Sequence, residues 1–281
     1  MVFSLTNRSL SKIPRAWSVV LAMLLLLSVL PTTHSSGSEI YVSSDITSDT
    51  TWSNGDVVHI NGLIHVLSGI TLTILPGAIV KFDADSVLYV DSGAKFNAIG
   101  SQGASIIFTS NSSIPNVGDW NKIQFAPNCI SSLEYVKIEY ATTGINILGG
   151  NVTIKNVDIS NTTTGVQISD GNLSIENATM NVWSGLKVIG SISPTISNST
   201  IISTGESFSL SNGATAIAIN CTFDVNKVVS SSDSKLIVKK YLDLRVQWSN
   251  ATGENIYPAE GADVYINATD GTCAFEGTTN Q

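Results

Sequence analysis

The sequence predicts an all-β protein: a right-handed parallel β-helix with coils of about 16–22 residues, followed by a short C-terminal β-sandwich-like segment or cap. Three observations lead to this prediction. Ile, Val and Thr are abundant with Ser, Asn and Gly between them, and no convincing 3.6-residue apolar period occurs. Short alternating segments end at turn residues such as Pro76-Gly77 and Ser92-Gly93. The segments from Leu133 onward repeat about every 21 residues.

Residues 1–36 are predicted to be a secretory signal peptide. Arg8, Lys12 and Arg15 precede an apolar run from Ser18 to Leu30, and small polar residues follow it. The run is shorter than the roughly 18 residues of a spanning helix, although an uncleaved N-terminal anchor stays an alternative. The rest of the chain is therefore expected to be exported, to the cell surface or the extracellular space.

The β-helix is expected to occupy residues 37–230. Residues 69–100 alternate between apolar and polar positions and are interrupted by the Pro76-Gly77 and Ser92-Gly93 turns. Ile74, Val90 and Ile107 are spaced by 16 and 17 positions. We therefore expect them to occupy equivalent places in early coils that are tighter than the later ones.

From Leu133 onward, five segments fall into one register. Their third residues are 21 or 22 positions apart, namely Tyr135, Asn156, Asn177, Asn198 and Asn220. Apolar pairs recur in phase with them, namely Ile145/Ile147, Val166/Ile168, Leu186/Val188 and Phe208/Leu210. So short a period fits two or three strands per coil, and such coils bury their apolar faces by stacking in parallel. Each fully buried side chain would contribute roughly 1.5–3 kcal/mol.

The asparagines of this register are expected to form a structural ladder. We expect the amides of Asn156, Asn177, Asn198 and Asn220 to point inward and to bond to the backbone and to each other. A buried amide without a partner would cost about 1–3 kcal/mol.

Several segments make the chain recognisable: "WSNGDVVHINGLIHVLSGITLTILPGAIVKF", "GAKFNAIGSQGASIIFTS", "GDWNKIQF" and "SSLEYVKIEYATTGI". Together they resemble the parallel β-helix repeats of archaeal and bacterial cell-surface proteins, which have the pectate-lyase-like superfamily fold. The resemblance covers about residues 40–225. It implies an exported surface protein whose β-helix is a spacer or an adhesive scaffold, and Trp120 matches a structural tryptophan of the family.

Residues 231–281 are expected to form a partial β-sandwich-like segment or a cap. The stretch from Lys235 resembles the start of a carboxypeptidase-regulatory or immunoglobulin-like sandwich. It has room for three or four strands, whereas such a sandwich needs about seven. Either the chain is a fragment of a longer protein or these strands cover the open end of the helix, whose edge would otherwise aggregate.

The charge argues against nucleic acid as a partner. The chain has 14 Lys and Arg against 22 Asp and Glu, and loss of the leader would remove three basic residues, which leaves a net charge of about −11. No basic cluster is present to neutralise phosphates or to bind an anionic membrane. The expected partners are envelope proteins or polysaccharides, with membrane contact only through an uncleaved leader or a missing C-terminal anchor.

Residues suited to catalysis are scarce. A lyase of this fold needs a strong base near acidic residues, but after the leader the single arginine is Arg245. A glycosidase needs two carboxylates across the cleaved bond, roughly 5–10 Å apart. The densest acidic group is Asp83, Asp85 and Asp91, which we interpret as turn residues, with a weak Ca²⁺ site as the alternative. No other cofactor is expected.

The two histidines after the leader and the three cysteines give no metal-site pattern. His59 and His65 would lie nearly 20 Å apart in one strand, unless a turn at Asn61-Gly62 intervenes. Cys129, Cys221 and Cys273 allow at most one disulfide and are read as small buried residues. The tryptophans after the leader are expected in the core or in turns, with stacking on sugars as the alternative, and they are Trp52, Trp120, Trp183 and Trp248.

Nine Asn-x-Ser/Thr sequons after the leader suggest a glycosylated envelope protein. Three of them, at Asn177, Asn198 and Asn220, lie on the asparagine ladder, where an inward amide could not carry a glycan. The better acceptors are therefore predicted to be Asn111, Asn151, Asn161, Asn172, Asn250 and Asn267.

The function expected from the sequence is that of an exported structural or adhesive module, such as a surface-layer component, without a catalytic site. One alternative is a carbohydrate-binding module or a polysaccharide lyase or glycosidase. Another is a periplasmic accessory β-helix of the copper-enzyme type. This last alternative is disfavoured because the only methionine after the leader, Met180, is more than 100 positions from both histidines.

Overall fold

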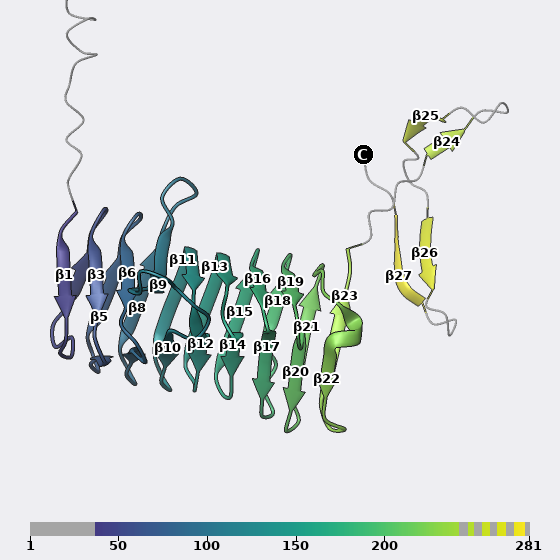
Figure 1. Cartoon of the computed structure of the whole chain (residues 1–281). Coiled ribbons are helices and arrows are strands. Elements are labelled where there is room, and N and C mark those ends of the chain that lie inside the picture. The colour runs from purple at the N-terminus through teal and green to yellow at the C-terminus, as the bar shows by residue number, and fades with distance from the viewer. Residues whose placement is uncertain (1–36, 242–246, 250–254, 259–262, 268–272, 279–281) are drawn as a thin grey trace, which may run out of the picture.

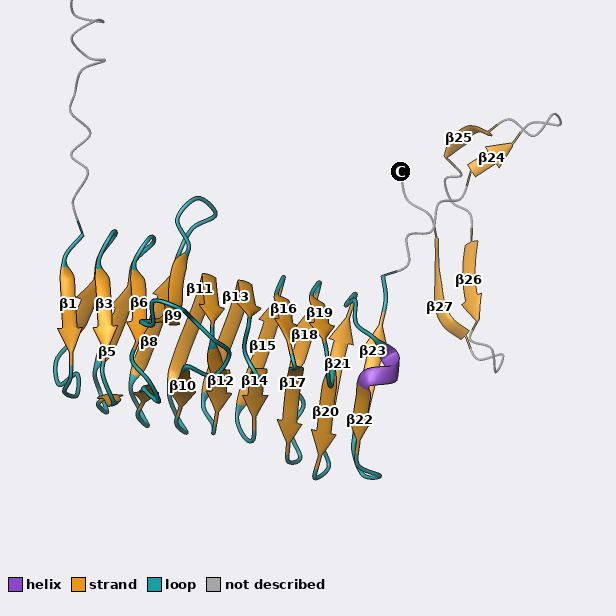
Figure 2. Ribbon diagram, in the orientation of Figure 1, coloured by secondary structure: helices purple, strands orange, loops and turns teal. Residues whose placement is uncertain are grey.

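The computed structural model describes residues 37–241, 247–249, 255–258, 263–267 and 273–278, with side chains described up to Tyr241. Residues 39–239 form an all-β parallel β-solenoid of about ten turns, which confirms the predicted fold class (Figure 1). Figure 2 shows the strands side by side along the solenoid axis, with loops between them at its edges. The predicted signal peptide, residues 1–36, lies outside the described residues.

The strands of successive turns stack into three ladders. We call these ladders the first, second and third faces, in the order in which the chain visits them. The first face consists of β1 (Glu39–Val42), β3 (Val57–Ile60), β6 (Ile79–Phe82), β9 (Ile106–Ser110), the second halves of β11 (Ile130–Glu139) and β13 (Asn151–Ser160), β16 (Thr179–Val182) and β19 (Thr200–Ser203). The second face consists of β4 (Leu63–Val66), β7 (Val87–Val90), β10 (Trp120–Phe125), β12 (Ala141–Ile147), β14 (Thr164–Ile168), β17 (Ser184–Ile189), β20 (Phe208–Ser211) and β22 (Val228–Ser230). The third face consists of β2 (Thr50–Trp52), β5 (Thr71–Ile74), β8 (Lys95–Ile99), the first halves of β11 and β13, β15 (Asn172–Glu176), β18 (Thr195–Ser197), β21 (Thr215–Ile219) and β23 (Lys235–Lys239).

The core is a set of stacked apolar columns. Side chains alternate between the interior and the outside along each strand, because successive residues of a strand point to opposite sides. Ile145 is in register with Val166, then Leu186 and Phe208 follow in the next two turns, and all are 0% exposed. The predicted apolar ladder of the later coils is confirmed.

The register expected for the early coils is wrong. Ile74 lies on the third face and pairs with Ala98, whereas Val90 lies on the second face and Ile107 on the first. Equivalent residues are further apart, as in the 22 positions between Val57 and Ile79. The spacing of 16 or 17 positions relates residues on different faces, because each turn carries three alternating segments that look alike in the sequence.

The asparagine column forms the corner between the third and first faces. Tyr135, Asn156, Asn177, Asn198 and Asn220 all have φ between 48° and 53°. Asn tolerates this left-handed conformation better than most residues with a side chain. The column therefore lets the chain turn within a single residue, and β11 and β13 run through it without a break.

The predicted inward orientation of this ladder is wrong. Asn177, Asn198 and Asn220 are exposed and Asn156 is half-buried. Amide contacts do join neighbouring turns: Asn177 Nδ2 donates to Asn156 Oδ1 at 3.3 Å, and Asn220 Nδ2 donates to Asn198 Oδ1 at 2.9 Å. The left-handed corner directs these side chains outward, while the next residue of each turn enters the core, as Ala178 does.

The parallel ladders continue beyond the expected boundary at residue 230. After the 3₁₀ turn η1 (Val225–Lys227), β22 pairs with β20 and β23 pairs in parallel with β21. Further along the chain, β24 (Gln247–Ser249) pairs with β25 (Asn255–Pro258), and β26 (Asp263–Asn267) pairs with β27 (Cys273–Thr278), both antiparallel. In the part of the chain that the structure describes, no helix is long and apolar enough to cross a membrane.

Candidate functional site

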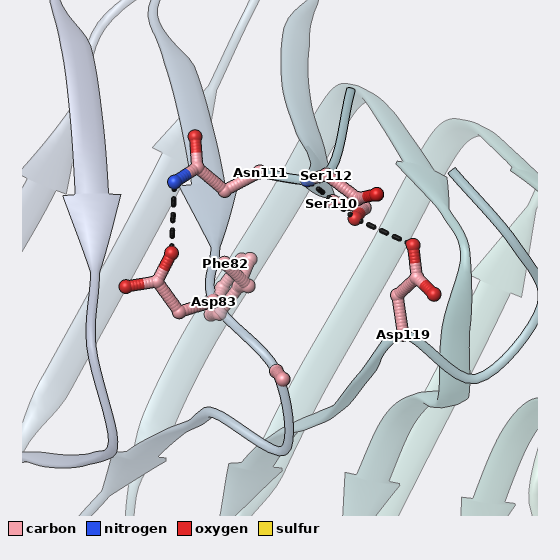
Figure 3. Close-up of a pocket in the computed structure, with 7 residues that line it drawn as sticks. Phe82, Asp83, Ser110, Asn111, Ser112 and Asp119 are labelled. Carbon is pink, nitrogen blue, oxygen red and sulfur yellow. Dashed lines mark hydrogen bonds between the residues drawn. The ribbon is translucent and has the colours of Figure 1, made fainter. Parts of the chain in front are cut away.

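A polar pocket of about 320 Å³ opens where the chain passes from the first face to the second (Figure 3). The turn after β6 and the loop between β9 and β10 form it. Its lining consists of Phe82, Asp83, Ala84, Ser110, Asn111, Ser112 and Asp119. The loop at residues 111–119 is an insertion in the repeat, so this is one of the places where the solenoid is least regular.

Asp83 joins three turns of the solenoid. Its Oδ2 accepts a hydrogen bond from Asn61 Nδ2 at 2.8 Å, and its Oδ1 accepts one from Asn111 Nδ2 at 2.8 Å. Asn61 follows β3, Asp83 follows β6 and Asn111 follows β9, which are successive strands of the first face. Both carboxylate oxygens therefore hold neighbouring turns together.

Asp119 fixes the two ends of the inserted loop. Its Oδ2 accepts a hydrogen bond from Ser110 Oγ at 2.7 Å and another from the backbone N–H of Asn116 at 2.9 Å. Ser110 Oγ in turn accepts one from the backbone N–H of Ser112 at 3.0 Å. The loop is thus held by a side-chain network within itself.

The pocket network extends along the outside of the first face to the first turn. His59 Nδ1 lies 3.1 Å from Asn111 Oδ1, and His59 Nε2 lies 2.5 Å from Glu39 Oε2. The imidazole also stacks on Tyr41, with 4.6 Å between ring centroids and 11° between planes. His59 is therefore held on three sides.

The residues that the sequence proposed as a Ca²⁺ site do not form one cluster. Asp83 and Asp85 lie in a turn rather than on one face of a strand, because Asp85 has φ 60°. Asp91 follows β7 on the second face, where its Oδ1 lies 2.8 Å from His65 Nδ1. In the described residues no group of three or more His, Cys, Asp or Glu side chains could hold a metal ion.

The two histidines in the described part of the chain belong to separate networks. A turn does intervene at Asn61-Gly62, where Gly62 has φ 85°, so His59 lies on the first face and His65 on the second. His65 is tilted against Tyr89, with 4.9 Å between ring centroids. Each histidine is paired with a different carboxylate.

The sequons with described side chains are all exposed, including those at Asn177, Asn198 and Asn220. Asn111, Asn172, Asn177 and Asn220 use Nδ2, the atom that would carry a glycan, to donate to a neighbour. Asn250 and the side chain of Asn267 lie outside the described residues. The predicted preference for six acceptors loses its basis, because the ladder asparagines point outward.

Of the tryptophans, Trp52 and Trp120 are buried, as expected of core residues, whereas Trp183 is 53% exposed.

Cys129 and Cys221 are buried free thiols. Burial raises the pKa of both thiols above the ordinary value. The side chains of Trp248 and Cys273 are outside the described part of the chain.

The pocket offers two carboxylates, two hydroxyls and an amide to a bound molecule. Its carboxylates lie on different segments, but each already accepts hydrogen bonds from protein donors. General acid–base catalysis needs a carboxyl group within hydrogen-bond reach of the substrate proton. Asp83 uses both carboxylate oxygens for Asn61 and Asn111, whereas both hydrogen bonds to Asp119 end on Oδ2, so among the described residues Asp119 Oδ1 has no donor.

The early turns and the pocket lie in a region that matches a known family. Residues 44–130 match the family model of the pectate-lyase like beta helix domain. No curated protein and no solved structure matches the chain. The pectate-lyase-like parallel β-helix is thus supported by the family match over the early turns and by the parallel register over the later ones.

Sequence reasoning found Asp83 in the pectate-lyase-like domain but missed its partners. Asn61, Ser110 and Asp119 stand alone in the sequence and belong to no motif. The one available signal was the interruption of the repeat at residues 111–119, since a long insertion in a solenoid is a common place for functional residues.

Proposed function

We propose that the chain is an exported structural and adhesive module of the cell surface, that it carries glycans and that it has no catalytic site. It would reside outside the cell and contact envelope proteins or polysaccharides, and its acidic charge disfavours nucleic acid. The observation that carries the proposal is the pairing of Asp83, whose two carboxylate oxygens connect Asn61 and Asn111 in adjacent turns.

Several features support a scaffold. The polar exceptions to the repeat are engaged with one another: Asp119 with Ser110, His59 with Glu39, and Asp91 with His65. The contacts of His59 with Glu39 and of Asp91 with His65 join successive turns, and the contact of Asp119 with Ser110 holds the inserted loop. A solenoid of this kind presents long flat faces, on which repeated weak contacts to a surface polymer can add together.

A carbohydrate-active protein is the second candidate. It is favoured by the pocket, which holds Asp83 and Asp119 within the region that matches the pectate-lyase-like family. A glycosidase would use one carboxyl group as an acid and the other as a base or nucleophile.

The decisive experiment separates the two candidates. The purified full chain is incubated with neutral polysaccharides (xylan, mannan) and acidic ones (polygalacturonate, alginate), with and without Ca²⁺, and newly released chain ends are measured. The scaffold proposal expects no release under any condition. Release by the wild type that Asp83→Asn and Asp119→Asn abolish, with Asp170→Asn as an exposed control, would contradict it.

A further inference from the structure

Trp183 is an exception among the tryptophans whose side chains are described. It lies in the turn between β16 and β17, and 53% of its surface is exposed, whereas Trp52 and Trp120 are 1% and 0% exposed. An exposed side chain of this size forgoes the hydrophobic free energy that its burial would contribute.

The indole is held by a glycine in the next turn. Gly205 donates its backbone N–H to Trp183 O at 2.9 Å. A Cβ at Gly205 would lie only 2.5 Å from Trp183 Cε2, 2.8 Å from Cδ2 and 2.9 Å from Cζ2. Because all three atoms belong to the six-membered ring, one face of the indole covers the glycine. The φ of Gly205 is outside the left-handed region, so the space is what requires glycine there.

The position departs from its column in the solenoid. In the preceding turn the equivalent residue is Thr163, since Ser184 N–H bonds to Thr163 O at 2.8 Å. In the following turn Thr204 is equivalent, since Gly205 N–H bonds to Trp183 O in the same way, so the column reads threonine, tryptophan, threonine over three turns. Gly205, which follows Thr204, leaves room for one face of the indole.

Polar residues lie close to Trp183 along the chain and in the two neighbouring turns. Asn161, Thr163, Asn181 and Thr204 belong to the same three turns and are exposed, and Glu206 is half-buried. Asn161 N–H bonds to Asn181 O at 3.2 Å, which places these two segments side by side. Within the described residues, none of these five side chains makes a hydrogen bond to another protein group. Amides and hydroxyls can both donate and accept hydrogen bonds.

We propose that Trp183 is a stacking subsite for a neutral sugar ring, with Asn161, Thr163, Asn181 and Thr204 as hydrogen-bonding groups at its edge. A pyranose has an apolar face that fits an aromatic ring and hydroxyls around its rim. Glu206 and the net charge of −8 disfavour an acidic sugar. The inference rests on the proposed adhesive function and assigns the place on the molecule where adhesion occurs.

The test measures retardation of the purified full chain in native gels that contain xylan or mannan, with polygalacturonate and alginate gels for comparison. We expect at least one neutral polysaccharide to retard the wild type. Trp183→Ala should weaken this affinity at least tenfold, and Trp183→Tyr should keep most of it. Gly205→Ala should also weaken it, because the new Cβ displaces the indole while Trp183 is retained.

Controls make the outcomes distinct. Ile130→Ala removes an exposed apolar side chain from the third face and should leave the affinity unchanged. Thermal unfolding of each variant shows whether the fold survives. The inference is overturned if no neutral polysaccharide binds, if only the acidic ones bind, or if Trp183→Ala binds as well as the wild type.

Beads coated with mannose-type glycopeptides distinguish a protein-linked glycan from a free polysaccharide, and binding to either supports the subsite. Released chain ends, in contrast, would contradict the scaffold proposal whatever Trp183 does.

Discussion

The indole of Trp120 lies parallel to the ring of Phe82, with 4.0 Å between ring centroids and 8° between planes. The two residues belong to different faces, since Phe82 ends β6 and Trp120 begins β10. Trp120 Nε1 also donates to Glu139 O at 2.7 Å. The pair therefore fixes the corner below the polar pocket and the inserted loop.

Replacement of Trp120 should destabilise the solenoid. Trp120→Ala removes a fully buried side chain and leaves a cavity beside Phe82, so we expect a loss of about 3–5 kcal/mol in the free energy of unfolding. Urea unfolding followed by circular dichroism measures this. Ile130→Ala, at an exposed position, should change the free energy by only about 0.5 kcal/mol. Equal effects of the two substitutions would contradict the structural role of Trp120.

The asparagine corner should distinguish glycine from alanine. Asn177 has φ 53°, where an ordinary side chain costs roughly 1–2 kcal/mol. Asn177→Ala should therefore lower the free energy of unfolding by about that amount, whereas Asn177→Gly should be less harmful because glycine adopts this φ readily. If both variants unfold at the same urea concentration, the amide contact with Asn156 matters more than the backbone conformation.

Loss of Asp119 should release the inserted loop. Asp119→Ala removes the acceptor for Ser110 Oγ and for the N–H of Asn116. We expect hydrogen exchange within residues 111–119 to accelerate at least tenfold, while exchange in β13 stays unchanged. Asp119→Asn, which keeps one acceptor oxygen, should have a smaller effect. Unchanged exchange in Asp119→Ala would show that the loop is held by other contacts.

The two buried thiols should make the fold less stable at high pH. Burial raises the pKa of Cys129 and Cys221 in the folded chain, whereas in the unfolded chain each thiol ionises near its ordinary pKa of about 8.5. Above that pH the unfolded state loses protons that the folded state keeps, so stability falls as the pH rises, and below it the thiols contribute no pH dependence. The urea midpoint of wild type should drop more between pH 8 and pH 10 than that of Cys129→Ala/Cys221→Ala. Parallel pH profiles would contradict this.

Glycan occupancy should follow the hydrogen bonding of the amides if glycans are added to the folded chain. In the described residues the Nδ2 atoms of Asn151, Asn161 and Asn198 donate to no protein group, whereas those of Asn111, Asn172, Asn177 and Asn220 do. A glycopeptide map of the chain purified from its native source should find higher occupancy at the first three. Equal occupancy at all seven would indicate that glycans are added before folding.

The sequence predicted the solenoid well because its signal is repeated. The 21-residue repeat from Leu133 onward appears both in the apolar columns and in the left-handed corner. Five similar segments therefore indicate the same register. Before Leu133 each turn carries three similar alternating strands of unequal spacing, and nothing in Ile74, Val90 or Ile107 tells which face each belongs to. The expected end of the β-helix at residue 230 was too early, and the ladders continue through Lys239. The reason is related, because in the sequence β23 resembles the start of a different domain.

The candidate site was less predictable because it depends on stacking between turns. Asp83 meets Asn61 and Asn111, which are 22 and 28 positions away. The orientation of the asparagine column depended on a backbone angle that composition does not reveal. The exposure of Trp183 depended on Gly205 in the next turn, and in the sequence that glycine resembles any other turn residue.

The direction of the backbone hydrogen bonds has a mechanical consequence. In a parallel solenoid these bonds run along the long axis and join each turn to its two neighbours. The first and last turns lie at opposite ends of the axis (Figure 1). A tensile force applied through those ends would load the terminal turn first and peel strands away in succession. The solenoid would then lengthen under low force in steps of one turn, dissipating work as an extensible tether.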